Sequence, residues 1–214
     1  ESQLIYLADR VCTLTAEYND AYILTIIPKI RLFVAENAGE HFYPAYSHAL
    51  LELTEIESVW LDLVSCETLN LLDNAERAYI DISIDQLVKL ARLFSYLIDF
   101  RSPHTATHSS GVAKTAEKLA ELMHFSPDEC KKVLAAGYVH DVGKLAIETD
   151  VLEKQGRLEP SEYEFIKSHV YYTYHLLKGI SGLDSILTCA SYHHEKLNGK
   201  GYPFHVKGDL IPLC

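Results

Sequence analysis

The chain has 214 residues, of which 48% are hydrophobic, and it carries a formal net charge of −11 at pH 7. This length allows one large domain or two small ones with a buried core. Affinity for a nucleic-acid backbone comes from Lys and Arg side chains that displace counterions, so an acidic chain is a poor general DNA binder. The sequence contains no run of 18 or more apolar residues, and we therefore expect no membrane span.

Charge and histidine are unevenly distributed along the chain. Residues 1–100 hold 6 Lys and Arg against 16 Asp and Glu (−10), whereas residues 101–214 hold 13 against 14 (−1). Nine of the 11 histidines also fall after residue 100, which makes the second half the place to look for chemistry. The 5 cysteines form no C-x-x-C pair and no signal-like pattern opens the chain. We therefore expect a cytoplasmic protein with reduced thiols.

The periodicity of apolar residues predicts an all-α fold. Capping-box spacing at Ser83 and Gln86, and again at Ser126 and Glu129, indicates two helix starts, and Gly179 is expected to end a helix. Helices are expected over residues 84–99, 126–140, 160–178 and 183–194. The turn-rich stretch 72–83 is expected to divide an acidic N-terminal part from the histidine-rich part, with the helix at 84–99 connecting them.

The dipeptide His140-Asp141 ends an apolar helix and is followed by Gly143 and Lys144. A neutral imidazole and a carboxylate at a helix end can bind the same cation, and this mixture of nitrogen and oxygen ligands suits iron, manganese or zinc. The dipeptide alone is weak evidence, because a purely structural role would explain it as well.

Further histidines recur on the neighbouring predicted helices. His108 lies near the start of one helix, His169 lies in the middle of another, and His193 and His194 close the next. Consecutive residues on a helix point about 100° apart. We therefore expect His193 and His194 to address different ions of a close pair, roughly 3.5–4 Å apart in two-metal sites.

This arrangement resembles the HD-GYP family, a branch of the HD-domain metal-dependent phosphohydrolases. The segment VLEKQGRLEPSEYEFIKSH is also similar to the family's link between the second and third histidine motifs. The resemblance covers about residues 100–214. The matching positions are His108-Ser109, His140-Asp141-x-Gly143-Lys144, His169, and His193-His194-Glu195 through Gly199-x-Gly201-Tyr202-Pro203.

The resemblance implies an HD-domain helical bundle that holds two divalent metal ions or three, with iron or manganese favoured and zinc as a further candidate. It implies hydrolysis of cyclic di-GMP, a bacterial second messenger, to the linear dinucleotide or to GMP. Asp141 and Lys144 would then be catalytic, with Asp141 bridging the metals and Lys144 contacting phosphate or donating a proton. The implied metal ligands are His108, His140, Asp141, His169, His193 and His194.

The signature loop Gly201-Tyr202-Pro203 would contact the substrate, and in the family it has been linked to signalling partner proteins. A homodimer is also compatible with the sequence. Two departures from the family pattern stand out. The chain stops at DLIPLC, short of the downstream aspartate that closes the family's site, and His104 replaces a glutamate that trinuclear members use. His104 is either a ligand or a solvent-side residue.

The N-terminal part has its own resemblance. The stretch ESQLIYLADRV is similar to the missing downstream segment, with Asp9 at the place of its aspartate. Residues 1–82 would then be the C-terminal half of one HD-GYP-like domain, and residues 101–214 the N-terminal half of another. Alternatively, Asp9 completes the metal site of residues 101–214, within one chain or across a swapped dimer. A generic acidic helical regulatory domain is the third interpretation.

Two other functions remain open at this point. A non-catalytic module that binds a cyclic dinucleotide or a partner protein would explain a missing closing aspartate. A phosphohydrolase for a different nucleotide would keep the same metal ligands but is disfavoured by the loop at Gly201-Tyr202-Pro203.

Overall fold

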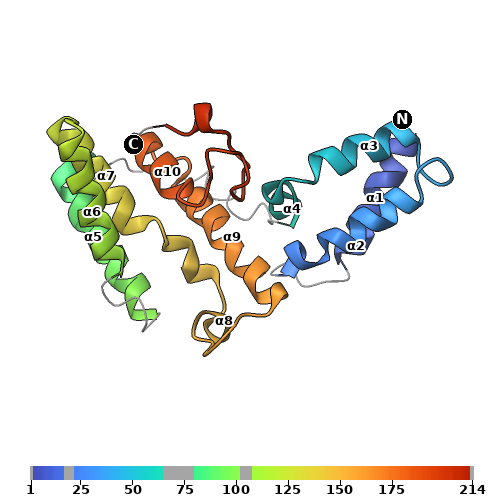
Figure 1. The fold of residues 1–214 in the computed structure, drawn as a ribbon, viewed down its shortest axis with the longest axis horizontal. Helices are drawn as coiled ribbons and strands as arrows, with labels where there is room; N and C mark the ends of the chain where they lie inside the picture. Colours follow the sequence, from blue (N-terminus) through green and yellow to red (C-terminus); the bar gives the residue numbers. More distant parts are fainter. Residues whose placement is uncertain (1, 17–21, 65–79, 102–107, 213–214) are drawn as a thin grey trace. The chain divides into compact units, whose positions relative to one another are not determined.

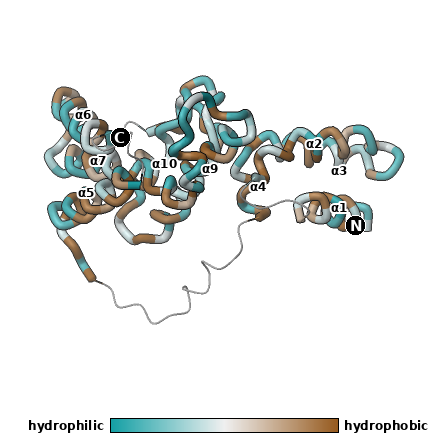
Figure 2. Tube along the Cα trace, turned by 90° about the horizontal axis from the view of Figure 1, so that it is seen from below, coloured by the Kyte–Doolittle hydropathy of each residue, from teal (hydrophilic) through white to brown (hydrophobic). Residues whose placement is uncertain are grey.

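The computed structural model describes residues 2–16, 22–64, 80–101 and 108–212. Within these ranges every regular element is a helix, and the only β-type pairings are two isolated bridges, Ala38 with Phe42 and Asn198 with Lys207. The prediction of an all-α fold is confirmed (Figure 1). Figure 2 shows hydrophobic and hydrophilic residues interleaved along the helices, as expected for amphipathic helices that bury one face.

The chain divides into two compact units. The first comprises residues 1–75 together with 159–165, and the second comprises residues 76–158 and 166–214. The helix that we expected to connect two parts therefore belongs to the second unit. The interpretation of the two units as halves of consecutive HD-GYP domains stays a prediction.

The first unit is built around an apolar core. Trp60 is fully buried, and its indole Nε1 donates a hydrogen bond to the carbonyl oxygen of Thr54 at 2.9 Å. Helix α2 packs against the other three helices and supplies five buried aliphatic side chains. The described helices of this unit outside residues 159–165 are α1 (Ser2–Ala16), α2 (Ile23–Glu36), α3 (Pro44–Leu53) and α4 (Glu57–Val64).

The second unit is organised around α7, against which α5, α6 and α10 all pack. Small residues allow the helices to approach closely: a Cβ atom at Gly137 would lie 2.5 Å from the Cα atom of Ala113. Helix α9 begins in the first unit and continues in the second. The described elements of the second unit are α5 (Ile84–Arg101), α6 (His108–Leu122), α7 (Pro127–Val139), η4 (Val142–Ala146), α8 (Thr149–Leu152), most of α9 (Pro160–Leu177), α10 (Asp184–Ser191) and η5 (Gly208–Leu210).

The predicted helix ends are largely confirmed. The Ser126 side chain accepts a hydrogen bond from the Glu129 backbone N–H, and the Glu129 carboxylate accepts one from the Ser126 backbone N–H, which completes the capping box. Ser83 and Gln86 make the same reciprocal pair at the start of α5. Gly179 follows the end of α9 with φ +83°, a conformation that glycine adopts without strain.

Two sequence-level expectations about the environment of the chain can be compared with the structure. None of the described helices combines the length and apolarity needed to cross a bilayer. Cys12 and Cys130 are free thiols, as expected. Cys189, however, is disulfide-bonded, so the expectation of reduced thiols is wrong at that position.

Candidate metal centre

His140 and Asp141 lie where α7 ends and the chain turns into the short helix η4. Both residues are buried, at 7% and 3% exposure. The His140 Nε2 atom lies 3.1 Å from Asp141 Oδ2, and Lys144 Nζ lies 2.7 Å from the same oxygen. A buried carboxylate is stable only when it is paired or bound to a metal, so this corner of the fold is built to hold positive charge.

The turn after Asp141 is docked tightly on α9. A Cβ atom at Gly143 would lie 1.9 Å from the carbonyl oxygen of His169, so no side chain fits at this position. The Gly143 backbone N–H donates to Thr173 Oγ1, and that hydroxyl donates to the carbonyl oxygen of His140, both at 3.0 Å. Thr173 therefore locks the end of α7 to α9, and sequence reasoning assigned it no role.

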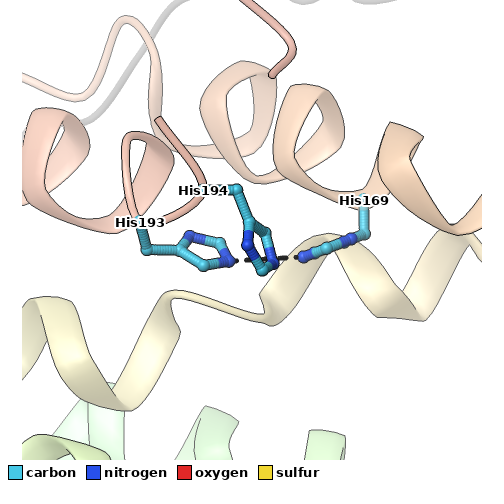
Figure 3. A group of neighbouring side chains, drawn as sticks. All are labelled: His169, His193 and His194. Carbon is cyan, nitrogen blue, oxygen red and sulfur yellow. Dashed lines mark hydrogen bonds between the residues drawn. The ribbon is translucent and has the colours of Figure 1, made fainter. Parts of the chain in front are cut away.

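The structure brings all six predicted ligands together in two neighbouring groups. In each group the candidate ligand atoms lie within 4.8 Å of one another. Asp141 connects the groups, because its Oδ1 atom lies 3.3 Å from His169 Nε2 and 3.9 Å from His193 Nε2. Figure 3 shows three of the imidazoles converging, His169 from α9 and His193 and His194 from the turn that follows α10. The two groups are His108, His140 and Asp141, and His169, His193 and His194.

Three of these histidines share a hydrogen-bonding pattern that defines their tautomer. Each places Nδ1 within 2.6–2.8 Å of the carbonyl oxygen three residues earlier. A carbonyl oxygen can only accept, so Nδ1 carries a proton, and whenever the ring is neutral its Nε2 lone pair faces the cluster. The pairs are His140 with Gly137, His169 with Ile166, and His193 with Ala190.

The donor set fits a divalent cation. His169 Nε2 and His193 Nε2 lie only 3.4 Å apart. With both Nδ1 atoms donating to carbonyls, two lone pairs face each other beside the Asp141 carboxylate. Such a set of acceptors repels itself unless a cation lies among them. Imidazole nitrogen together with carboxylate oxygen suits iron, manganese or zinc.

The protonation of His193 and His194 agrees with this interpretation. Burial, together with the neighbouring histidines, lowers the pKa of His193 to about 3, and burial with the charge of His169 lowers the pKa of His194 to about 4. Both rings are therefore neutral at pH 7, as a metal-binding imidazole must be. Burial is the largest influence on His140 and lowers its pKa, but the hydrogen bond to Asp141, the charge of Asp141 and the Gly137 carbonyl together raise it, so the net shift is upward. Burial opposes ionisation of Asp141, yet His140 and His169 hold its pKa well below the usual range.

The position of His193 and His194 differs from the expectation. Helix α10 ends at Ser191, and the two histidines lie in the turn that follows it. Outside the helix they are free of the 100° rotation between neighbours, and their ring centroids lie 4.2 Å apart. Both belong to the same group with His169. The prediction that a helix carries both histidines is therefore wrong, whereas their binding of different ions stays a prediction.

The signature loop folds back onto this turn. A Cβ atom at Gly201 would lie 2.3 Å from the Cα atom of Glu195, so the loop backbone approaches as closely as glycine allows. The Tyr202 ring stacks on the His194 imidazole, with centroids 4.8 Å apart and planes 21° apart. Pro203 follows through a cis peptide bond and is fully buried. The loop thus forms one wall beside the histidine cluster.

Glu195 holds this loop in place, a role that sequence reasoning missed. Its Oε1 atom accepts a hydrogen bond from the Phe204 backbone N–H at 2.8 Å, and its Oε2 atom accepts one from the Val206 N–H at 3.0 Å. A carboxylate that accepts backbone N–H groups makes charge-assisted bonds, which are stronger than neutral ones. In the sequence, the feature that could have indicated this role is the position of Glu195 between His194 and the glycine-containing loop.

The start of α6 is anchored by a second buried carboxylate. Ser109 Oγ donates to Asp99 Oδ1 at 2.7 Å, and both residues are buried. His108, the first residue of α6, is exposed, and its ring centroid lies 5.7 Å from that of His140. Asp99 was not among the predicted functional residues. His104 lies outside the described residues.

Asp9 lies in the first unit, on α1, where Leu7 and Val11 are buried as predicted. Its side chain is 57% exposed and pairs with Arg10 at 2.6 Å. The apolar face predicted beside Asp9 is smaller than expected, because Leu4 is itself 54% exposed.

The fold and the cluster together define a helical domain with a histidine–aspartate metal-ligand set of the HD type. A family model described as HD domain matches residues 92–214, more than half of the chain. The chain belongs to the HD domain family. Divalent metal binding is a property of this family of phosphohydrolases.

Curated relatives carry cyclic-dinucleotide activities in their names. The chain is 33% identical over 137 residues to 3'3'-cGAMP-specific phosphodiesterase 3 of Vibrio cholerae, covering 64% of the chain and 30% of the relative. It is 27% identical to 3'3'-cGAMP-specific phosphodiesterase 1 of the same organism, covering 98% and 50%. It is 26% identical to a cyclic di-GMP phosphodiesterase of Thermotoga maritima, covering 92% and 43%. The chain thus spans half or less of the length of these relatives.

Proposed function

We propose that this chain is part of a metal-dependent phosphodiesterase that hydrolyses cyclic di-GMP to the linear dinucleotide or to GMP. The observation that carries the proposal is the position of the Asp141 carboxylate, which belongs to one three-residue ligand group and lies beside a histidine of the other. Two-metal phosphoesterases use such a shared centre, with ions about 3.5–4 Å apart. The names of the curated relatives support the cyclic-dinucleotide substrate class.

The proposed ligands are the five histidines of the two groups and Asp141, which would bridge two ions. The mixture of imidazole nitrogen and carboxylate suits iron, manganese and zinc alike, and the resemblance to the HD-GYP family favours iron or manganese. A third ion would need a ligand near His104. When bound, the metals would lower the pKa of a water molecule and neutralise the phosphate oxygens.

The remaining chemistry falls to side chains of the chain. Hydrolysis adds one water across one P–O bond, so the departing ribose oxygen must gain a proton. Lys144 is the proposed donor or phosphate contact, since its Nζ reaches the Asp141 carboxylate at 2.7 Å. Gly201, Tyr202 and Pro203 would form the wall against which the substrate lies, because Tyr202 stacks on the ligand His194.

The second candidate is a signalling module that binds a cyclic dinucleotide or a partner protein without turnover. The same two ligand groups and the Tyr202 wall would bind such a ligand whether or not it is cleaved. A cytoplasmic location, a homodimer and partner proteins at the Gly201-Tyr202-Pro203 loop also stay predictions. A phosphohydrolase for another nucleotide would use the same ligands.

An assay of the full chain separates these functions. Protein loaded with Mn²⁺ or Fe²⁺ is incubated with cyclic di-GMP, with 3'3'-cGAMP and with linear nucleotides, and products are resolved by chromatography. We expect cleavage of cyclic di-GMP that stops when a chelator removes the metal. Tight binding without any turnover would instead establish the signalling module. Cleavage confined to linear nucleotides would establish the third function.

A further inference from the structure

The last turn of α5 contacts two separate parts of the proposed metal centre without carrying a ligand itself. Asp99 Oδ1 accepts a hydrogen bond from Ser109 Oγ at 2.7 Å, and Ser109 directly follows the proposed ligand His108 in the first turn of α6. Two residues after Asp99, Arg101 binds the segment that follows Asp141. One turn of helix is thus attached to both ends of the first ligand group, which comprises His108, His140 and Asp141.

Arg101 makes the second of these attachments with several hydrogen bonds. Its guanidinium group donates to the carbonyl oxygen of Leu145, to that of Ile147 at 3.2 Å and to Thr149 Oγ1 at 3.3 Å. A guanidinium group presents its N–H donors in a rigid planar fork, so three acceptors around one fork define the position of the segment that carries them. The helix η4 lies in this segment and begins directly after Asp141. Arg101 therefore fixes the turn that holds the shared carboxylate.

We propose that Asp99 and Arg101 are positioning residues that set His108 against Asp141 and so create the binding site for the ion of the first ligand group. This inference rests on the proposed function. It deepens that function by naming the side chains, themselves outside the ligand set, that hold two metal ligands in register.

His108 is the member of its group that most needs such support. His140 and Asp141 are buried, whereas His108 is exposed. The His140 ring is held by the carbonyl oxygen of Gly137, but none of the described residues makes a hydrogen bond to the His108 ring. Metal-binding histidines are normally oriented by a hydrogen-bond partner of their own. The position of His108 therefore depends on the backbone of the first turn of α6, which Ser109 attaches to α5.

Stability alone does not explain the buried pair. Asp99 and Ser109 are 4% and 1% exposed, and Asp99 Oδ2 has no hydrogen-bond partner among the described residues. A buried carboxylate oxygen without a partner costs free energy, and well-packed apolar residues often replace buried polar pairs without loss of stability. A pair that costs stability and fixes the residue beside a ligand is what the orientation of a metal site requires.

Two residues of the same helix serve as matched controls. Ser95 is as deeply buried as Ser109, but its Oγ donates to the carbonyl oxygen of Arg92 within α5. Arg92 is exposed, and its Nε donates to the Tyr96 hydroxyl at 3.0 Å within α5. Ser109→Ala is therefore compared with Ser95→Ala. Arg101→Lys, which keeps the charge but loses the fork, is compared with Arg92→Lys.

The test measures how many Mn²⁺ ions each protein holds. The full chain and the four variants are titrated with Mn²⁺, and binding is followed by elemental analysis and electron paramagnetic resonance. Two Mn²⁺ ions that share a carboxylate are magnetically coupled, so their spectrum differs from that of a single bound ion. For Ser109→Ala and Arg101→Lys we expect the affinity for one of the two ions to fall about 10- to 100-fold, the range found for residues that orient metal ligands.

The spectrum and the turnover should then change together. At the Mn²⁺ concentration where wild-type protein shows a coupled pair, Ser109→Ala and Arg101→Lys should show a single ion. Turnover of cyclic di-GMP by these two variants should return at high Mn²⁺, because the ligands themselves are intact. Ser95→Ala and Arg92→Lys should keep the coupled pair. The two test variants are independent, so either one decides the question if the other does not fold.

Urea unfolding of the metal-free proteins separates this role from a purely structural one. Test variants that lose free energy of unfolding but keep the coupled pair would overturn the inference, and so would an equal weakening of both ions or an equal loss in the controls. Wild-type protein that binds two ions but cleaves nothing would refute the phosphodiesterase alone, and the titrations would still decide the roles of Asp99 and Arg101. Wild-type protein that binds no Mn²⁺ would refute both.

Discussion

The two units of the chain bury different kinds of residue. In the described part of the first unit, the buried polar residues are the hydroxyls Ser47 and Thr54 around a core of aliphatic and aromatic side chains. The second unit buries ionisable groups, including Asp99, His140 and Asp141. Burying ionisable groups costs stability unless partners or a metal compensate. The first unit is therefore built for packing, whereas the second gives up packing energy to assemble a site.

Removing the shared carboxylate and its neighbour should give the largest effect. The double variant His140→Ala and Asp141→Ala deletes one ligand and the group that connects the two triads, so we expect complete loss of bound metal and of turnover. Elemental analysis of the purified protein measures this directly. Trp60→Phe, a change in the core of the other unit, serves as the control and should keep its metal. Unchanged metal content in the double variant would refute the site assignment.

A change that adds only a methyl group should distinguish a tightly docked turn of the second unit from an open position on one of its helices. At Gly143 a Cβ atom would lie 1.9 Å from a backbone oxygen, and we expect Gly143→Ala to destabilise the second unit by roughly 2–4 kcal/mol. At Gly111, in α6, nothing lies within 4 Å of the added atom. Gly111→Ala should therefore be neutral or stabilise by about 0.5–1 kcal/mol. Urea unfolding followed by circular dichroism measures both, and equal effects would show that the turn at Gly143 is not tightly docked.

The smallest effect is expected at Asp9. Its carboxylate is exposed and paired with Arg10, and exposed pairs contribute roughly 0–1 kcal/mol. Asp9→Asn should therefore leave metal content unchanged and shift the free energy of unfolding by less than about 0.5 kcal/mol. Metal loss in this variant would instead favour the alternative in which Asp9 completes the site. Both units would then contribute ligands to one metal centre.

Much of the second unit follows from the sequence alone because its signals are local. Capping boxes at Ser83 and Ser126 act over three residues, and apolar periodicity acts within a helix. These signals predicted the helices that carry the candidate ligands. The recurrence of histidines on successive helices predicted which side chains would meet, and the structure brings the six together.

Only the tertiary structure decided how those side chains meet. Whether His193 and His194 stay on α10 or leave it depends on the loop that folds back through Gly201 and on the Glu195 clamp. The roles of Thr173 and Asp99 rest on partners 33 and 10 residues away. No periodicity encodes such contacts. They arise when helices distant in the chain pack together and each buried polar group must find a partner.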